Sequence, residues 1–135
     1  MEKKTIKVLL AKVGLDHQNK EIRLLARGLR DQGGMEVIYT GLYGTLEEIV
    51  QTAVQDKVHF VGLSVHNGSH RELFPRLKEL LAAQKASHIL VFGGGMIPEQ
   101  HRQELKASGA VDEIFEPGTP VSKIIAWLNN NNLNL

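Results

Sequence analysis

Histidines are the side chains of this chain best suited to bind a metal or move a proton. His17 follows one apolar run, and His66 and His70 follow another. Imidazole is the commonest nitrogen ligand for protein-bound metals, but these histidines lie in two separate segments with no supporting pattern of carboxylates. The pattern therefore disfavours a metal site built from protein side chains alone. The remaining three are expected at solvated positions, at the starts of elements or on a helix surface: His59, His88 and His101.

Two further groups of residues could bind a ligand. Gly93, Gly94 and Gly95 directly follow an apolar run. Three residues without side chains let a flat ligand lie against the backbone, whereas a simple turn usually needs one glycine, so we favour a close approach. Ser64 ends another apolar run, where its hydroxyl could bond a ligand or cap a turn. Asp16 could cap the helix that follows it or orient a neighbouring histidine.

Short apolar runs of β type alternate with segments of helical periodicity, and these elements must position the residues above. The Thr45–Glu48 segment has the spacing of a capping box and opens a helix, and Pro75 is expected in the first turn of its helix, where proline is tolerated. Strands are expected at 6–13, 36–40, 60–65, 88–92 and 112–115. Helices are expected at 19–32, from 45 onward, at 72–84, at 99–107 and after Pro120.

Five strand–helix units predict an α/β fold with an open parallel sheet and helices on both faces. Their number favours the flavodoxin-like (Rossmann-like) strand order 2-1-3-4-5. Ligands of such sheets bind beyond the carboxyl ends of the strands, so function should reside in loops 14–19, 64–70, 93–98 and 116–120. We expect residues 1–128 to form one domain and residues 129–135 a disordered tail.

Composition and missing motifs exclude several classes of protein. The 135 residues carry a formal net charge of +1, without the basic excess of a dedicated nucleic-acid binder, and contain no cysteine. No apolar run is long enough for a membrane helix, and the N-terminus reads as a strand rather than a signal peptide, so we expect a cytoplasmic protein. A phosphoacceptor receiver would need an Asp after the third strand and a Lys after the fifth, where Ser64 and Glu116 stand. Neither a Rossmann nor a Walker glycine motif is present.

The sequence resembles a known family over residues 7–128. The stretches KVLLAKVGLDHQNKEIRLLARGL, EVIYTG, TLEEIV, FVGLS, ILVFGGGMIP and EPGTP are similar to the cobalamin-binding domain of acyl-CoA mutases. That family includes methylmalonyl-CoA mutase and the small subunits of isobutyryl-CoA and 2-hydroxyisobutyryl-CoA mutases. The resemblance implies an isomerase subunit that carries adenosylcobalamin, while a large partner subunit holds the acyl-CoA in a barrel.

The resemblance also implies which residues contact the cofactor, and several of them depart from the family pattern. Members carry D-x-H-x-x-G after the first strand, with the histidine as lower cobalt ligand. Here Asp16 is kept, Gln18 takes the ligand position, and Glu21 takes the position of the glycine that leaves room for the nucleotide tail. His17 stands one residue early and is the candidate cobalt ligand, and His66 replaces an apolar residue of the tail pocket. The residues that match the family are Ser64, Gly93, Gly94, Gly95, Pro117, Gly118 and Thr119.

Three functions follow from this combination of kept and altered residues. In the first, the chain binds cobalamin for a mutase reaction with unusual ligation: His17, His66, a water or the cofactor's own base on cobalt. In the second, it is a non-catalytic corrinoid carrier or sensor. In the third, it has lost cobalamin and serves as a scaffold subunit, or binds another flat ligand. We favour the first, in which the chemistry comes mainly from the cofactor.

Overall fold

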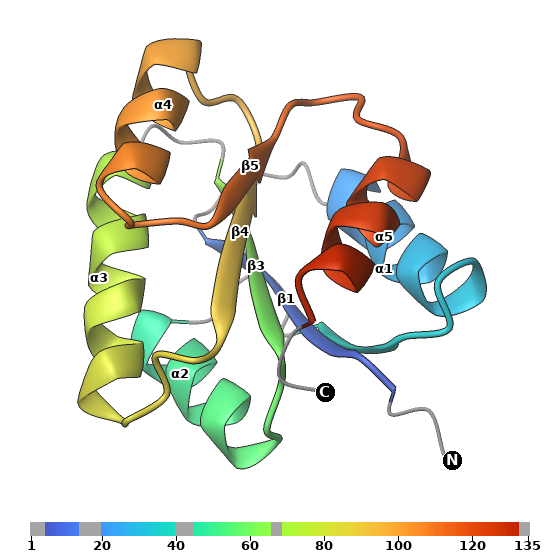
Figure 1. The fold of residues 1–135 in the computed structure, drawn as a ribbon, viewed down its shortest axis with the longest axis horizontal. Helices are drawn as coiled ribbons and strands as arrows, with labels where there is room; N and C mark the ends of the chain where they lie inside the picture. Colours follow the sequence, from blue (N-terminus) through green and yellow to red (C-terminus); the bar gives the residue numbers. More distant parts are fainter. Residues whose placement is uncertain (1–4, 14–19, 40–44, 66–68, 133–135) are drawn as a thin grey trace.

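A computed structural model describes residues 5–13, 20–39, 45–65 and 69–132 of the chain. Strands and helices alternate along it (Figure 1). The strands are β1 (Lys7–Val13), β2 (Glu36–Tyr39), β3 (Phe60–Val65), β4 (Leu90–Gly94) and β5 (Glu113–Phe115). The helices are α1 (Lys20–Asp31), α2 (Leu46–Gln55), α3 (His70–Ala83), α4 (Glu99–Ala107) and α5 (Val121–Asn130). None of the helices described is long and apolar enough to cross a bilayer.

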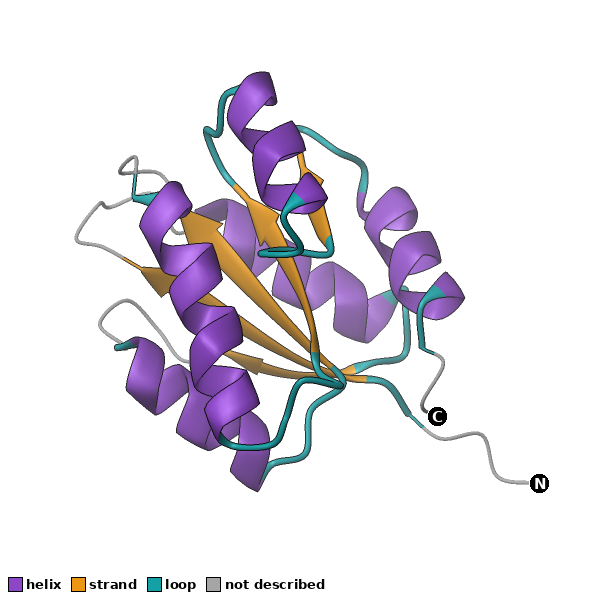
Figure 2. Cartoon of the chain, turned by 60° about the vertical axis from the view of Figure 1, so that its left-hand side comes forward, coloured by secondary structure: helices purple, strands orange, loops and turns teal. Residues whose placement is uncertain are grey.

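The five strands form one parallel sheet in the order β2-β1-β3-β4-β5, which confirms the predicted fold class and strand order. β1 and β3 lie in the middle of the sheet and pair in register from Val8 opposite Phe60 to Val13 opposite Val65. Both strands are covered on their two faces, so they are almost continuously apolar, as central strands of parallel sheets are. The strand arrows in Figure 2 all point to one edge of the sheet, so the carboxyl ends of the five strands lie along that edge.

Helices cover both faces of the sheet, with α1 and α5 on one face and α2, α3 and α4 on the other (Figure 1). Successive side chains of a strand point to opposite faces, so β1 contributes Leu9 to the core under α2 and α3 and Leu10 to the core under α1 and α5. In the second core, the single tryptophan, Trp127, packs against Phe92 and Phe115 with ring centroids 5.9 Å from each.

Local sequence explains how α2 begins, and the structure corrects two of the boundaries expected from the sequence. Thr45 caps α2 by accepting a hydrogen bond from the amide of Glu48, as the capping-box spacing predicts. The expectation for Pro75 was wrong: α3 begins at His70, so the proline lies in the second turn, where its ring removes one bond of the helix. The fourth strand also lies two residues later than expected, because Gly93 and Gly94 continue the pairing with β3. α5 continues to Asn130.

Candidate functional site

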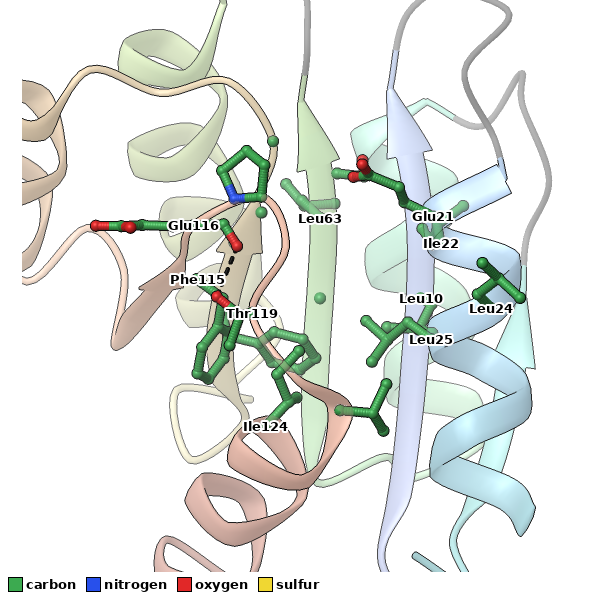
Figure 3. Close-up of a pocket in the computed structure, with 18 of the residues that line it drawn as sticks. Leu10, Glu21, Ile22, Leu24, Leu25, Leu63, Phe115, Glu116, Thr119 and Ile124 are labelled. Carbon is green, nitrogen blue, oxygen red and sulfur yellow. Dashed lines mark hydrogen bonds between the residues drawn. The ribbon is translucent and has the colours of Figure 1, made fainter. Parts of the chain in front are cut away.

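A cavity of about 280 Å³ opens at the carboxyl edge of the sheet, between α1, the strand ends and the loop that joins β5 to α5 (Figure 3). Its floor is apolar and comes from Leu10 of β1, Phe92 of β4 and Phe115 of β5. Leu25 of α1 and Ile124 of α5 face each other across it. These side chains come from five different elements, so the cavity exists only in the folded chain. A hollow with this lining is suited to a largely apolar group.

The three consecutive glycines at its edge serve different purposes. A side chain on Gly93 would overlap the buried ring of Phe74, and one on Gly95, where φ is +118°, would overlap the carbonyl of Val65. The fold itself therefore requires these two glycines. A Cβ on Gly94 would instead meet only the carbonyl oxygen of Phe115, at 3.9 Å. Gly94 is thus the position at which the missing side chain leaves space for a ligand.

The loop between β5 and α5 forms the opposite rim of the cavity. Gly118 has a φ of +84°, which favours glycine. The Thr119 hydroxyl donates to the carbonyl oxygen of Glu116 at 2.6 Å, and the Thr119 amide donates to the same oxygen at 3.1 Å. These bonds close a tight turn and hold Pro117, Gly118 and Thr119 at the mouth (Figure 3).

Glu21 places a negative charge at the mouth. It lies in the first turn of α1, and its exposed side chain extends from the helix across the opening of the cavity (Figure 3). Among the described residues it has neither an ion-pair nor a hydrogen-bond partner. A carboxylate in this place repels any anionic part of a ligand that enters.

The structure brings most of the predicted site residues together. Eight of them line the one cavity: Glu21, Ser64, Gly93, Gly94, Gly95, Pro117, Gly118 and Thr119. The other four, Asp16, His17, Gln18 and His66, lie outside the described residues. The candidate cobalt ligand His17 is one of these, so it stays a prediction. In the part of the chain that the structure describes, no three His, Cys, Asp or Glu side chains form a metal site.

His70 does not lie in the cavity, although the sequence places it in a loop at the mouth. It begins α3, is 4% exposed, and its Nε2 lies 2.9 Å from Nδ1 of His101 on α4. Burial lowers the pKa of His70, and the neighbouring His101 and Arg71 lower it further. His101 and His59 were expected at solvated positions, and this expectation was wrong because both are half-buried. Nδ1 of His59 accepts a hydrogen bond from the amide of Lys7.

Lys12 is a buried charged residue that the sequence reasoning missed. It is fully buried near the end of β1, opposite Ser64 of β3, and burial lowers its pKa. Alternation along the strand puts it on the same face of the sheet as Leu10 in the cavity floor. A lysine inside the apolar run KVLLAKV is the signal that could have drawn attention to it, because a buried ammonium requires a specific environment.

Comparisons with known proteins agree with the geometry of this edge. Residues 6–126 match the family model described as the B12 binding domain. The chain is 40% identical over 125 residues to the 2-hydroxyisobutanoyl-CoA mutase small subunit of Aquincola tertiaricarbonis, covering 93% of this chain and 90% of that protein. It is 36% identical to the pivalyl-CoA mutase small subunit of Xanthobacter autotrophicus, covering 89% and 79%. It is also 39% identical to a part of the methylmalonyl-CoA mutase large subunit of Propionibacterium freudenreichii, covering 85% of this chain and 16% of that one.

Solved structures share the fold at low sequence identity. A cobalamin-binding protein from Desulfitobacterium hafniense superposes with a TM-score of 0.76 at 18% identity, covering 93% of this chain and 58% of that one. A response regulator from Desulfuromonas acetoxidans superposes with a TM-score of 0.69 at 18% identity, covering 93% and 94%. Both likenesses show the flavodoxin-like arrangement and nothing more specific.

Proposed function

The chain belongs to the B12-binding domain family, and we propose from this premise that it is the cobalamin-binding small subunit of an adenosylcobalamin-dependent acyl-CoA mutase. The observation that carries the proposal is the glycine-edged cavity at the carboxyl edge of the sheet. It occurs in a chain that matches a mutase small subunit over nearly the full length of both.

The residues of the cavity fit part of such a cofactor. Cobalamin carries an aromatic base on a nucleotide tail, and the floor of Leu10, Phe92 and Phe115 offers it apolar contacts. The open position at Gly94 admits a flat group against the backbone. The hydroxyls of Ser64 and Thr119 at the rim offer hydrogen bonds to the sugar. The apolar floor and the polar rim thus match the two ends of a nucleotide.

Adenosylcobalamin supplies the radical chemistry of a carbon-skeleton rearrangement when it is bound. The role of this chain is to hold the cofactor at the edge of the sheet and to exclude water from the cofactor's nucleotide tail. We assign the acyl-CoA contacts to a large partner subunit, since the chain matches two small subunits of mutases. We also place the protein in the cytoplasm, without a nucleic-acid or membrane partner.

We further propose that the lower side of cobalt is ligated in an unusual way. Gln18 takes the place of the family's histidine, and Glu21 takes the place of its glycine. The ligand is then His17, His66, a water or the cofactor's own base. The charge of Glu21 at the mouth supports a loosened hold on the tail, because the phosphodiester of the tail is also negative.

An absorption spectrum of the protein, taken after mixing with cobalamin and desalting, tests the proposal. Colour that travels with the protein in stoichiometric amount is the expected result, and the band positions show whether the cofactor's own base stays on cobalt. Gly94→Leu should abolish retention because its side chain fills the space at Gly94, whereas Gly94→Ala, which adds a single methyl group there, should weaken retention less. Equal retention by both variants would refute the assignment of the cavity.

A colourless wild-type fraction would instead favour the scaffold function, in which the subunit no longer carries cobalamin. Recovery of a barrel-containing large subunit by the tagged chain separates the two remaining functions. A mutase subunit should recover it, while a free-standing corrinoid carrier or sensor should not.

A further inference from the structure

A second hollow, next to the first, lies along the outer side of α1 beside the end of β2. Its volume is about 490 Å³, within the range of small-molecule sites. Four cationic side chains of α1 line it together with Tyr39, the last residue of β2. The cations are Lys20, Arg23, Arg27 and Arg30.

The four cations form one continuous stripe. Residues three or four positions apart lie on the same face of a helix, and the spacing from Lys20 to Arg30 corresponds to about 15 Å along the axis at the usual helical rise. All four are exposed. Like charges at this spacing repel one another, so the stripe does not stabilise the isolated helix.

No acidic residue forms an ion pair with this stripe within the described part of the chain. Arginines on the other helices are each paired: Arg71 with Glu104, Arg76 with Glu47, and Arg102 of α4 with Glu116. By contrast, the hydrogen bond of Arg30 goes to the carbonyl oxygen of Val37, not to a carboxylate. The positive charges of the stripe are therefore not held in ion pairs with described residues, and they are available to an anion from outside.

Tyr39 provides a second, independent observation at the same hollow. Its hydroxyl is buried, and in the described structure it has no hydrogen-bond partner. A buried hydroxyl without a partner loses the free energy of its bonds to water. The arginine side chains that line the same hollow are exposed, and an acceptor oxygen drawn in by them would satisfy the hydroxyl.

We propose that this hollow binds a chain of two or more phosphates, such as the diphosphate of a nucleotide. Arginine guanidinium groups form paired hydrogen bonds with phosphate oxygens, and the stripe is too long for a single phosphate. A concave site of this volume suits a small anion better than the flat acidic surface of a protein. The proposal does not depend on cobalamin binding.

Titration calorimetry of the purified chain at low salt, with pyrophosphate and with ADP, tests the site. Both anions should bind, and Arg23→Gln/Arg27→Gln should weaken them about tenfold or more because two charge-assisted contacts are lost. The matched control is Lys85→Gln/Lys123→Gln, which removes two exposed lysines elsewhere and should leave the affinities unchanged. Tyr39→Phe should weaken binding several-fold, and Gly94→Leu should leave it unchanged.

Two results would support the site and show which part of a nucleotide it contacts. Tighter binding of ADP than of pyrophosphate would show that the site also contacts the nucleoside, and equal affinities would show that it contacts the phosphate chain alone. The proposal is overturned if neither anion binds at millimolar concentration, or if the lysine control loses as much affinity as the arginine variant. It is also overturned if polyglutamate binds and the phosphates do not, because the stripe would then be a surface for an acidic protein.

Discussion

Gly93 and Gly94 are neighbours on β4, and replacing each with alanine should have opposite consequences for stability. At Gly93, an added Cβ would lie 3.0 Å from Cε1 of Phe74 and closer still to the tip of the ring. Phe74 is fully buried in the core under α2 and α3, so its ring cannot move aside without displacing other core residues. At Gly94 the nearest atom would be 3.9 Å away, an ordinary contact.

The size of the difference follows from the two environments. Overfilling a packed core costs about 1–3 kcal/mol. Replacing glycine with alanine also restricts the unfolded chain, which stabilises the protein by about 0.4–1 kcal/mol wherever the methyl group fits. This second contribution is common to both variants, so their difference isolates the overlap with Phe74. For 135 residues, a difference of about 1–3 kcal/mol corresponds to a Tm difference of roughly 4–11 °C.

Thermal unfolding followed by circular dichroism, together with urea unfolding, measures both variants. Gly94→Ala should unfold at or slightly above the wild-type temperature, and Gly93→Ala clearly below it. If Gly94→Ala is destabilised as much as Gly93→Ala, the space at Gly94 is not open, and the inference that this glycine admits a ligand fails with it.

Three further predictions address charge. Glu21→Gln should tighten cobalamin about fivefold by removing one repulsion at the mouth, while cobinamide, which lacks the nucleotide, should bind as before; equal effects on both in a spectrophotometric titration would count against this. Because burial and His101 lower the pKa of His70, the unfolded chain takes up a proton first as pH falls below about 6.5. Urea midpoints should therefore fall from pH 7.5 to pH 5, and less steeply for His70→Gln; parallel curves would contradict the assignment. Asp112→Ala should lower the free energy of unfolding by about 1–3 kcal/mol, because this carboxylate accepts from the amide of Val91 at 2.8 Å and from Nζ of Lys78 at 2.7 Å, and both donors lose their partner. Asp112→Asn keeps an acceptor and should lose less, and a larger loss for Asn than for Ala in urea unfolding would show that these bonds are not the cause.

Sequence periodicity was sufficient for the fold because the strands and helices of a parallel sheet differ strongly in pattern. The whole of α4 follows directly from it, and the start of α2 follows from the capping-box spacing that begins at Thr45. The end of β4 could not be predicted, since Gly93 and Gly94 look like chain breakers and yet continue the ladder opposite Leu63 and Ser64. Whether a glycine breaks a strand depends on the neighbouring strand, which local sequence does not contain.

The rim of the site was predictable for a different reason. The loops after parallel strands meet at one edge, so the sequence alone groups Ser64, Gly94 and Thr119 at the same place. The apolar lining could not be predicted, because Phe115 in the floor and Leu25 beside it have the same apolar periodicity as core residues. His70 was misplaced because α3 begins two residues earlier than its pattern suggested and turns this histidine toward His101.

The packing of Trp127 gives the protein a built-in optical reporter. It is the single tryptophan of the chain, and it touches Phe92 and Phe115, whose rings form the cavity floor. Indole fluorescence depends on its surroundings and is quenched by nearby coloured groups through energy transfer. Emission from this one residue therefore reports how far the cavity is filled, with no dye attached and no partner subunit present. Titration of the same signal measures the affinity of the cavity for ligands that have no colour.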